Sequence, residues 1–334
     1  MHINVAGLTK VYTTWNRGST FAEVLSSIVK RNKSEVHALR GIDFSIEKGE
    51  LVGFLGPNGA GKSTTLKILT GVLYPTAGEV SVLGVCPWKD RKKYVANIGA
   101  VFGQKSQLVW DIPPVDSFMM NQAIYRIPDA DFRRTLDRLT DMLGVREHMK
   151  QPTRNLSLGE RMKCEFIMAM LHNPRIVFLD EPTIGLDVIA KDRIREFIQE
   201  MNREGVTFIL TTHDLDDVER LARRVIVINH GSIVFDDGIA MLRRHFGAKK
   251  IVTAACASPF YFGNDGREQP LPAGVTLLNR LSPADVELEC DTSVMDLGSL
   301  IRLIGDTCGL RDLAVQEVPI ETVIKELYTD TAEV

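Results

Sequence analysis

The chain has 334 residues; 44% are hydrophobic and 25% are charged, with 40 basic residues against 43 acidic ones. This composition is typical of a folded protein with room for two domains, and it excludes a disordered or fibrous chain. The near balance of charge provides no global field for nucleic acid, so we expect no nucleic-acid partner.

The cysteines and the N-terminus indicate the compartment. Five cysteines are scattered without a C-x-x-C pair, which argues against a zinc site or a disulfide framework and favours a reducing cytosol. Met1 to Asn4 do not begin a basic segment followed by an apolar one, and no apolar run approaches the ~20 residues that span a bilayer. We therefore expect any membrane role to depend on a partner.

Two strand patterns, residues 3–11 and 38–46, flank an insertion of residues 15–36. In the insertion Thr20 and Glu23 form a capping-box pattern. Apolar residues follow at helical spacing: Phe21, Val24, Leu25, Ile28 and Val29. This predicts a short amphipathic helix, for which three surfaces are open: the domain's own sheet, a membrane subunit, or the lipid interface.

Buried strands alternate with helical segments from Leu51 onward. The apolar runs lie at residues 51–55, 98–102, 176–179, 207–212 and 225–228. Such alternation predicts an α/β domain with a mainly parallel sheet, which we place at residues 1–246. Residues 116–171 show no strand pattern, so we expect a helical lobe inserted between strands of the sheet.

The pattern changes after residue 246. Short strands are predicted near residues 251–255, 275–279 and 286–290, and helices near residues 296–308 and 321–328. Residues 247–334 are therefore expected to form a small α+β accessory domain.

A glycine-rich loop directly follows the strand at residues 51–55 and fits G-x-x-x-x-G-K-[ST], the phosphate-binding loop. Its backbone N–H groups and the start of the helix at residues 62–70 would hold phosphates, with Lys62 on the terminal ones and Ser63 on Mg²⁺. The expected nucleotide-binding residues are Gly56, Pro57, Asn58, Gly59, Ala60, Gly61, Lys62, Ser63 and Thr64.

Two carboxylates, Asp180 and Glu181, end the apolar strand that begins at Ile176. Acids at the carboxyl end of such a strand lie where α/β sheets bind ligands. We expect Asp180 to hold Mg²⁺, directly or through water, and Glu181 to orient or deprotonate the attacking water. Together with the phosphate-binding loop, they indicate a phosphate-loop ATPase.

Residues 156–160, Leu-Ser-Leu-Gly-Glu, indicate which class of phosphate-loop ATPase this chain resembles. Here the chain resembles the ATP-binding cassette (ABC) family, whose signature is L-S-G-G-Q, although Leu158 and Glu160 depart from it. Ser157 and Glu160 form a capping box, so Ser157 should begin a helix whose N-terminus faces an anion. The resemblance implies that this anion is the γ-phosphate of ATP bound to a partner subunit, contacted by Ser157, Gly159 and Glu160.

The resemblance implies further site residues. Gln104 matches the glutamine that contacts Mg²⁺ and water and links the site to the helical lobe. Asp187 lies in the loop that reaches across the dimer, His213 matches the histidine that bonds the γ-phosphate, and Tyr12 matches the aromatic ring that stacks on adenine. The predicted catalytic residues are thus Glu181, His213 and Gln104.

The resemblance covers residues 1 to about 245. Residues 101–108, 156–162 and 180–187 are similar to ATPases of bacterial drug and viologen exporters. This implies an exporter subunit at the cytoplasmic face of the membrane, with ATP and Mg²⁺ as cofactors and separate polytopic permease subunits as partners. One chain holds every expected position, so a homodimer could carry two complete sites; a heterodimer is the alternative.

Two other classes compete. Ribosomal ABC factors usually join two cassettes in one chain, and DNA-repair relatives insert a long coiled coil ahead of the signature; this chain has neither feature. A regulatory module without turnover would be expected to lack Glu181 or His213, and both are present. We therefore prefer the hypothesis that this chain is a transporter subunit.

Overall fold

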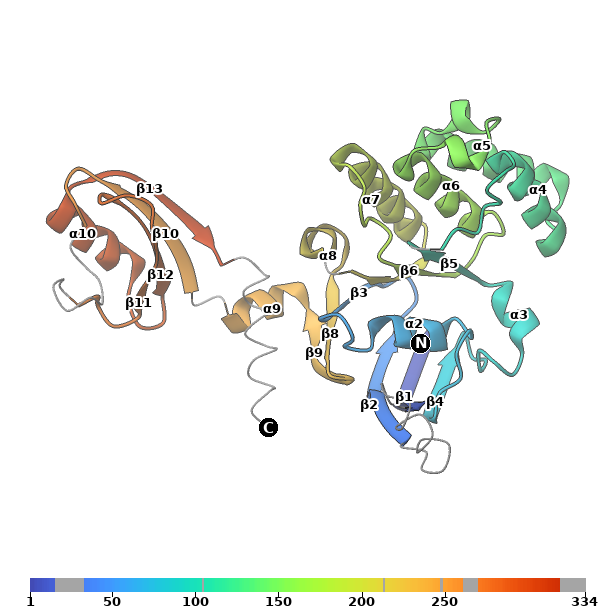
Figure 1. Cartoon of the computed structure of the whole chain (residues 1–334), viewed down its shortest axis with the longest axis horizontal. Coiled ribbons are helices and arrows are strands. Elements are labelled where there is room, and N and C mark those ends of the chain that lie inside the picture. The colour runs from blue at the N-terminus through green and yellow to red at the C-terminus, as the bar shows by residue number, and fades with distance from the viewer. Residues whose placement is uncertain (16–32, 104, 213, 247–248, 261–269, 319–334) are drawn as a thin grey trace, which may run out of the picture. The chain divides into compact units, whose positions relative to one another are not determined.

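The computed structural model divides into two compact units, Met1–Asp237 and Gly238–Val334 (Figure 1). It describes residues 1–15, 33–103, 105–212, 214–246, 249–260 and 270–318. The division falls after Asp237, whereas the sequence pattern placed it after residue 246. The difference is helix α9, Ile239–Phe246, which groups with the second unit.

Six of the described strands form the central sheet of the first unit, and the predicted parallel arrangement is confirmed. In order they are β5 (Ile98–Phe102), β6 (Ile176–Asp180), β7 (Thr207–Thr211), β3 (Leu51–Leu55), β8 (Arg224–Asn229) and β9 (Ser232–Gly238). The first five pair in parallel. Every residue of β3 and β7 is buried, which explains their uninterrupted apolar runs. Strand β9 was not predicted.

A second, antiparallel sheet has the order β2 (Lys33–Ile46), β1 (Ile3–Trp15) and β4 (Ala77–Val82). A shared core joins it to the central sheet, with the rings of Phe44 and Phe54 at a centroid distance of 5.2 Å. Apolar residues of α2 (Lys62–Leu69) fill the same core. Because β1 extends to Trp15 and β2 begins at Lys33, the predicted insertion of residues 15–36 was too long at both ends. Its helix lies outside the described residues.

The predicted helical lobe is confirmed. It contains α4 (Pro114–Tyr125), α5 (Asp129–Leu143) and α6 (Leu158–Met170), after the short helix α3 (Arg91–Val95). Helices α7 (Val188–Arg203) and α8 (Leu215–Leu221) follow β6 and β7. Helix α6 packs against α4, α5, α7 and β5 (Figure 1). It therefore connects the lobe to the edge of the central sheet.

In the described part of the second unit, helix α10 (Leu297–Cys308) packs on an antiparallel sheet. The sheet has the order β11 (Val275–Arg280), β12 (Asp285–Asp291), β10 (Lys249–Cys256) and β13 (Leu310–Glu317). Alternate residues of the strands, such as Val252 and Leu288, form its core together with Ile304 of α10. The three predicted strands and the first helix are present, β13 was not predicted, and the helix at residues 321–328 lies outside the described residues.

In the part of the chain that the structure describes, no helix combines the length and apolar character needed to cross a bilayer.

Candidate nucleotide site

The phosphate-binding loop leaves β3 and ends where α2 begins. Gly61 has φ +116°, and a Cβ there would lie 2.7 Å from the carbonyl oxygen of Ala38, so only glycine fits this turn against β2. No side chain caps the N-terminus of α2. The first N–H groups of the helix are therefore available to an anion, as the sequence predicted for phosphate.

The ammonium group of Lys62 holds the start of the phosphate-binding loop by hydrogen bonds. Its Nζ donates to the carbonyl oxygens of Gly56 at 2.5 Å and Pro57 at 3.1 Å. An ammonium has three N–H groups, so these two bonds leave one for a phosphate oxygen. Burial lowers the pKa of Lys62 from its ordinary value, while Glu181 and Asp180 act in the opposite direction. The two carboxylates thus help to keep the buried lysine charged.

Ser63 and Asp180 lie together although 117 positions separate them. Ser63 Oγ donates to Asp180 Oδ1 at 3.0 Å, and Thr211 Oγ1 donates to the same oxygen at 2.5 Å. This contact joins α2 to the ends of β6 and β7. A serine hydroxyl beside a carboxylate supplies the hard oxygen ligands that Mg²⁺ takes, so these residues fit the predicted metal.

Glu181 follows directly, with its backbone N–H bonded to the carbonyl oxygen of Thr211 at 2.9 Å. Its φ is +51°, a left-handed conformation that a residue other than glycine seldom adopts. Such local strain is common where a side chain must point in one direction. A pocket of about 420 Å³ opens here, lined by Ser63, Lys67, Phe102, Lys105, Asp180 and Glu181.

Tyr12 is presented by the β1–β2 hairpin. It pairs with Val36, two residues before Ala38, whose carbonyl lies against the phosphate-binding loop. Its side chain is 36% exposed, and the ammonium of Lys10 lies 5.2 Å from its ring centroid. An exposed ring at this position is consistent with the predicted stacking on adenine.

The predicted capping box at the start of α6 is confirmed. Glu160 N–H donates to Ser157 Oγ at 3.3 Å, and Ser157 N–H donates to Glu160 Oε2 at 2.8 Å. The other carboxylate oxygen lies 3.2 Å from His148 Nε2. Burial acts to raise the pKa of Glu160, but the bonds from Ser157 and the nearby His148 outweigh it and lower the pKa. The Glu160 carboxylate is therefore directed toward Ser157 and His148 at the N-terminus of its own helix.

Comparison with known proteins decides the family. Residues 39–184 match the family model described as ABC transporter. The chain is 32% identical over 210 residues to the ABC transporter ATP-binding protein NatA of Bacillus subtilis, covering 63% of this chain and 85% of NatA. The chain belongs to the ABC transporter ATP-binding proteins.

Two further comparisons agree. The energy-coupling factor transporter ATP-binding protein EcfA of Methanothermobacter thermautotrophicus is 30% identical over 272 residues, which are 80% of this chain and 83% of EcfA. A dimeric structure of the ATP-binding cassette MJ0796 bound to ADP and Pi shares the fold, with TM-score 0.59 and 23% identity, covering 71% of this chain and 98% of that one. As an ABC transporter ATP-binding protein, the chain binds and hydrolyses ATP in support of transport.

Apart from Tyr12, the described ABC site residues fall into two groups. The first contains the phosphate-binding loop, Asp180 and Glu181. In the second, a Cβ on Gly159 would lie 3.0 Å from Cβ of Ala190 and 3.8 Å from Oδ2 of Asp187. Asp187 caps α7 by accepting from Ala190 N–H at 2.9 Å. The signature and the Asp187 loop therefore form one surface.

Two predicted residues, Gln104 and His213, lie outside the described residues. Their neighbours are placed: Gly103 N–H donates to the Asp180 carbonyl at 2.9 Å, and Asp214 N–H donates to Thr212 Oγ1 at 2.9 Å. The two segments follow β5 and β7, the strands on either side of β6. Asp180 and Glu181 lie at the same carboxyl ends of the strands.

Sequence reasoning missed Glu165, a carboxylate of α6 that is only 3% exposed. It accepts from the hydroxyl of Ser106 and from the backbone N–H of Gln107 at 3.0 Å. Burial raises the pKa of Glu165, and these hydrogen bonds offset part of the effect. The residue ties the signature helix to the segment after Gln104. Its signal in the sequence was a single acid within the apolar run of residues 164–170.

Proposed function

We propose that this protein is the ATPase subunit of an exporter, in which two copies close around two ATP molecules and drive separate polytopic permease subunits. It would act as a peripheral protein at the cytoplasmic face of the membrane. The export direction rests on the segments 101–108, 156–162 and 180–187, which resemble drug and viologen exporter ATPases. The single observation that supports ATP hydrolysis at this site is the junction of Ser63, Asp180 and Glu181.

Each residue has a distinct task in this proposal. The loop from Gly56 to Thr64 binds the phosphates through its N–H groups, and Lys62 neutralises their charge. Ser63, Asp180 and Gln104 hold Mg²⁺, which would neutralise negative charge on the phosphate oxygens when bound. Tyr12 stacks on adenine.

Glu181 orients the attacking water and accepts its proton, and His213 donates a hydrogen bond to the γ-phosphate. The second copy completes each site. Its Ser157, Gly159 and Glu160 face the γ-phosphate through the N-terminus of α6, and Asp187 reaches across the interface. The Glu160 carboxylate accepts a hydrogen bond from Ser157 N–H and lies beside His148. These contacts offset its negative charge near the γ-phosphate.

Substituting Glu181 tests the catalytic assignment. In Glu181→Gln we expect the turnover number for Mg-ATP to fall about 10²-fold or more, since the amide retains the shape but not the basic carboxylate. The dissociation constant for ATP should change little. The exposed Glu79 in β4 offers a control, and Glu79→Gln should retain wild-type turnover. Turnover of Glu181→Gln near the wild-type value would contradict the assignment.

The membrane partner is tested separately. The chain is purified from gently solubilised membranes, and the accompanying proteins are identified. We expect a polytopic membrane protein to accompany it in a defined ratio. Recovery with ribosomes or DNA instead would support one of the competing classes.

A further inference from the structure

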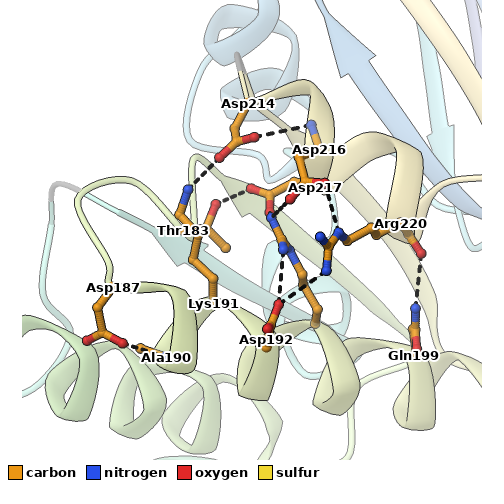
Figure 2. Close-up of polar contacts among 11 residues, drawn as sticks. Thr183, Asp187, Ala190, Lys191, Asp192, Gln199, Asp214, Asp216, Asp217 and Arg220 are labelled. Atoms are coloured by element: carbon orange, nitrogen blue, oxygen red, sulfur yellow. Dashed lines mark hydrogen bonds and ion pairs between the residues drawn. The ribbon is translucent and has the colours of Figure 1, made fainter. Parts of the chain in front are cut away.

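A buried ion pair joins α7 to α8, among the polar contacts drawn in Figure 2. Arg195 Nε donates to Asp217 Oδ1 at 2.7 Å, and Nη2 of the same guanidinium lies 2.5 Å from that oxygen. The Asp217 side chain has no exposed surface and that of Arg195 is 7% exposed. Asp216 and Asp192 also contact Arg195, at 2.8 and 3.1 Å. The arginine therefore has several acceptors around it.

The second carboxylate oxygen of Asp217 takes a different partner. Its Oδ2 accepts the hydroxyl hydrogen of Thr183, which is 1% exposed. Thr183 lies two residues after Glu181 and four before Asp187. One carboxylate thus holds the loop that runs from the catalytic glutamate to the dimer-facing aspartate.

A second contact ties the same two helices together at their N-termini. Lys191 Nζ in α7 lies 2.5 Å from Asp214 Oδ2, and Asp214 caps α8 by accepting from Asp216 N–H at 3.2 Å (Figure 2). Asp214 directly follows His213 in the chain. Both loops that leave β6 and β7 are thus attached to one polar network.

A buried ion pair is a costly way to join two helices. Taking both charges out of water costs several kcal/mol per ion, and well-packed apolar residues often stabilise a fold as well or better. Helices α7 and α8 already contact each other, and each also has buried apolar residues, such as Ile194 and Val218. The pair brings something that apolar packing lacks: a directed acceptor for the hydroxyl of Thr183.

We propose that Asp217, oriented by Arg195, is a positioning residue for ATP hydrolysis. By holding Thr183 it fixes the backbone of Glu181, whose φ of +51° needs support from its surroundings. Because α8 begins two residues after position 213, the same carboxylate sets the Glu181 loop relative to the His213 loop. This inference rests on the proposed role of Glu181.

The test uses a pair of substitutions at Thr183 that differ in the hydroxyl. Thr183→Val keeps the branched shape and removes the donor, whereas Thr183→Ser keeps the donor. Turnover per nucleotide-binding site and ATP affinity are measured for both. For Thr183→Val we expect turnover to fall about tenfold to a hundredfold, since small displacements of catalytic groups have effects of this size, with ATP affinity within about twofold. Thr183→Ser should stay within about threefold of wild type.

A purely structural role gives a different result, in which Thr183→Val lowers the melting temperature but leaves turnover per binding site unchanged. That result would overturn the inference, as would equal losses in Thr183→Val and Thr183→Ser. If Thr183→Val does not fold, the double variant Arg195→Met with Asp217→Leu decides. It replaces the pair by apolar side chains, and we expect a folded protein that binds ATP and turns over slowly; wild-type turnover would contradict us. Glu181→Gln is measured alongside, because an active Glu181→Gln refutes the role of Glu181 itself.

Discussion

At the scale of single residues, contiguous motifs could be predicted and tertiary pairs could not. The phosphate-binding loop, Asp180 and the capping box of Ser157 are each predicted from a few neighbouring residues in the sequence. The structure places Ser63 beside Asp180 and confirms the capping box. Asp217 and Glu165 act through partners 34 and 59 positions away in the chain. No local pattern marks such partners, because folding alone brings them together.

The departure at Leu158 has a local explanation. A Cβ on Gly185 would lie 3.2 Å from Leu158 Cδ2, so the leucine side chain lies against the loop that leads to Asp187. Leu158 is 38% exposed, and Ser157 beside it is also exposed. The leucine therefore leaves the serine hydroxyl and the helix N-terminus accessible.

The serine and the leucine should respond differently to substitution. In Ser157→Arg we expect ATP binding to be retained and turnover to fall by about tenfold or more, because a bulky side chain would fill the position meant for the partner's phosphate. Loss of the helix cap should also lower the free energy of unfolding of the protein by about 1 kcal/mol. Leu158→Gly is the matched control and should be mild. If Ser157→Arg turned over ATP like wild type, the serine would be only a helix cap.

At the scale of elements, burial explains which strands could be predicted. Strands β3, β6 and β7 are buried along nearly their whole length, so their sequences are continuous apolar runs. In β13 no residue is fully buried, and β4 has two buried residues and a glycine, so neither presents a clear pattern. Their pairing with β10 and β1 creates these strands. The helical lobe was predictable because its helices are long.

Glu165 gives a pH-dependent prediction for the link between α6 and the segment after Gln104. Burial raises the pKa of Glu165 above its unfolded value. The folded chain therefore holds this proton more tightly, so the free energy of unfolding falls as the pH rises from the unfolded pKa toward the folded one. Glu165→Gln removes this term. The melting temperature of Glu165→Gln relative to wild type should therefore be higher at pH 7 than at pH 4.

The control is Glu79→Gln, which replaces an exposed carboxylate in β4. The pH-dependent difference in melting temperature should be larger for Glu165→Gln than for this control. The prediction would be contradicted if the melting-temperature difference between Glu165→Gln and wild type were constant with pH or grew toward pH 4. Burial would then not raise the pKa of Glu165.

At the scale of the whole molecule, the exposed apolar side chains indicate where a second cassette would bind. Ile184, Val188 and Ile189 are 37%, 72% and 80% exposed, and they flank Asp187 in the sequence. Leu158, beside Ser157, adds to this surface. Apolar side chains gathered around a polar anion-facing helix end are suited to an interface that closes over a nucleotide. The sequence predicted that Ser157 and Asp187 face a partner, but the exposure of the apolar side chains around them follows from the fold.

The most direct test of two copies closing around ATP is sedimentation velocity of Glu181→Gln with and without Mg-ATP. Because this variant should bind ATP without hydrolysing it, we predict a monomer without nucleotide and a dimer with Mg-ATP. The double variant Glu181→Gln with Ser157→Arg should remain monomeric under both conditions. A Glu181→Gln protein that binds Mg-ATP and stays monomeric, or a dimer that forms equally well without nucleotide or with Ser157→Arg, would contradict the proposed shared site.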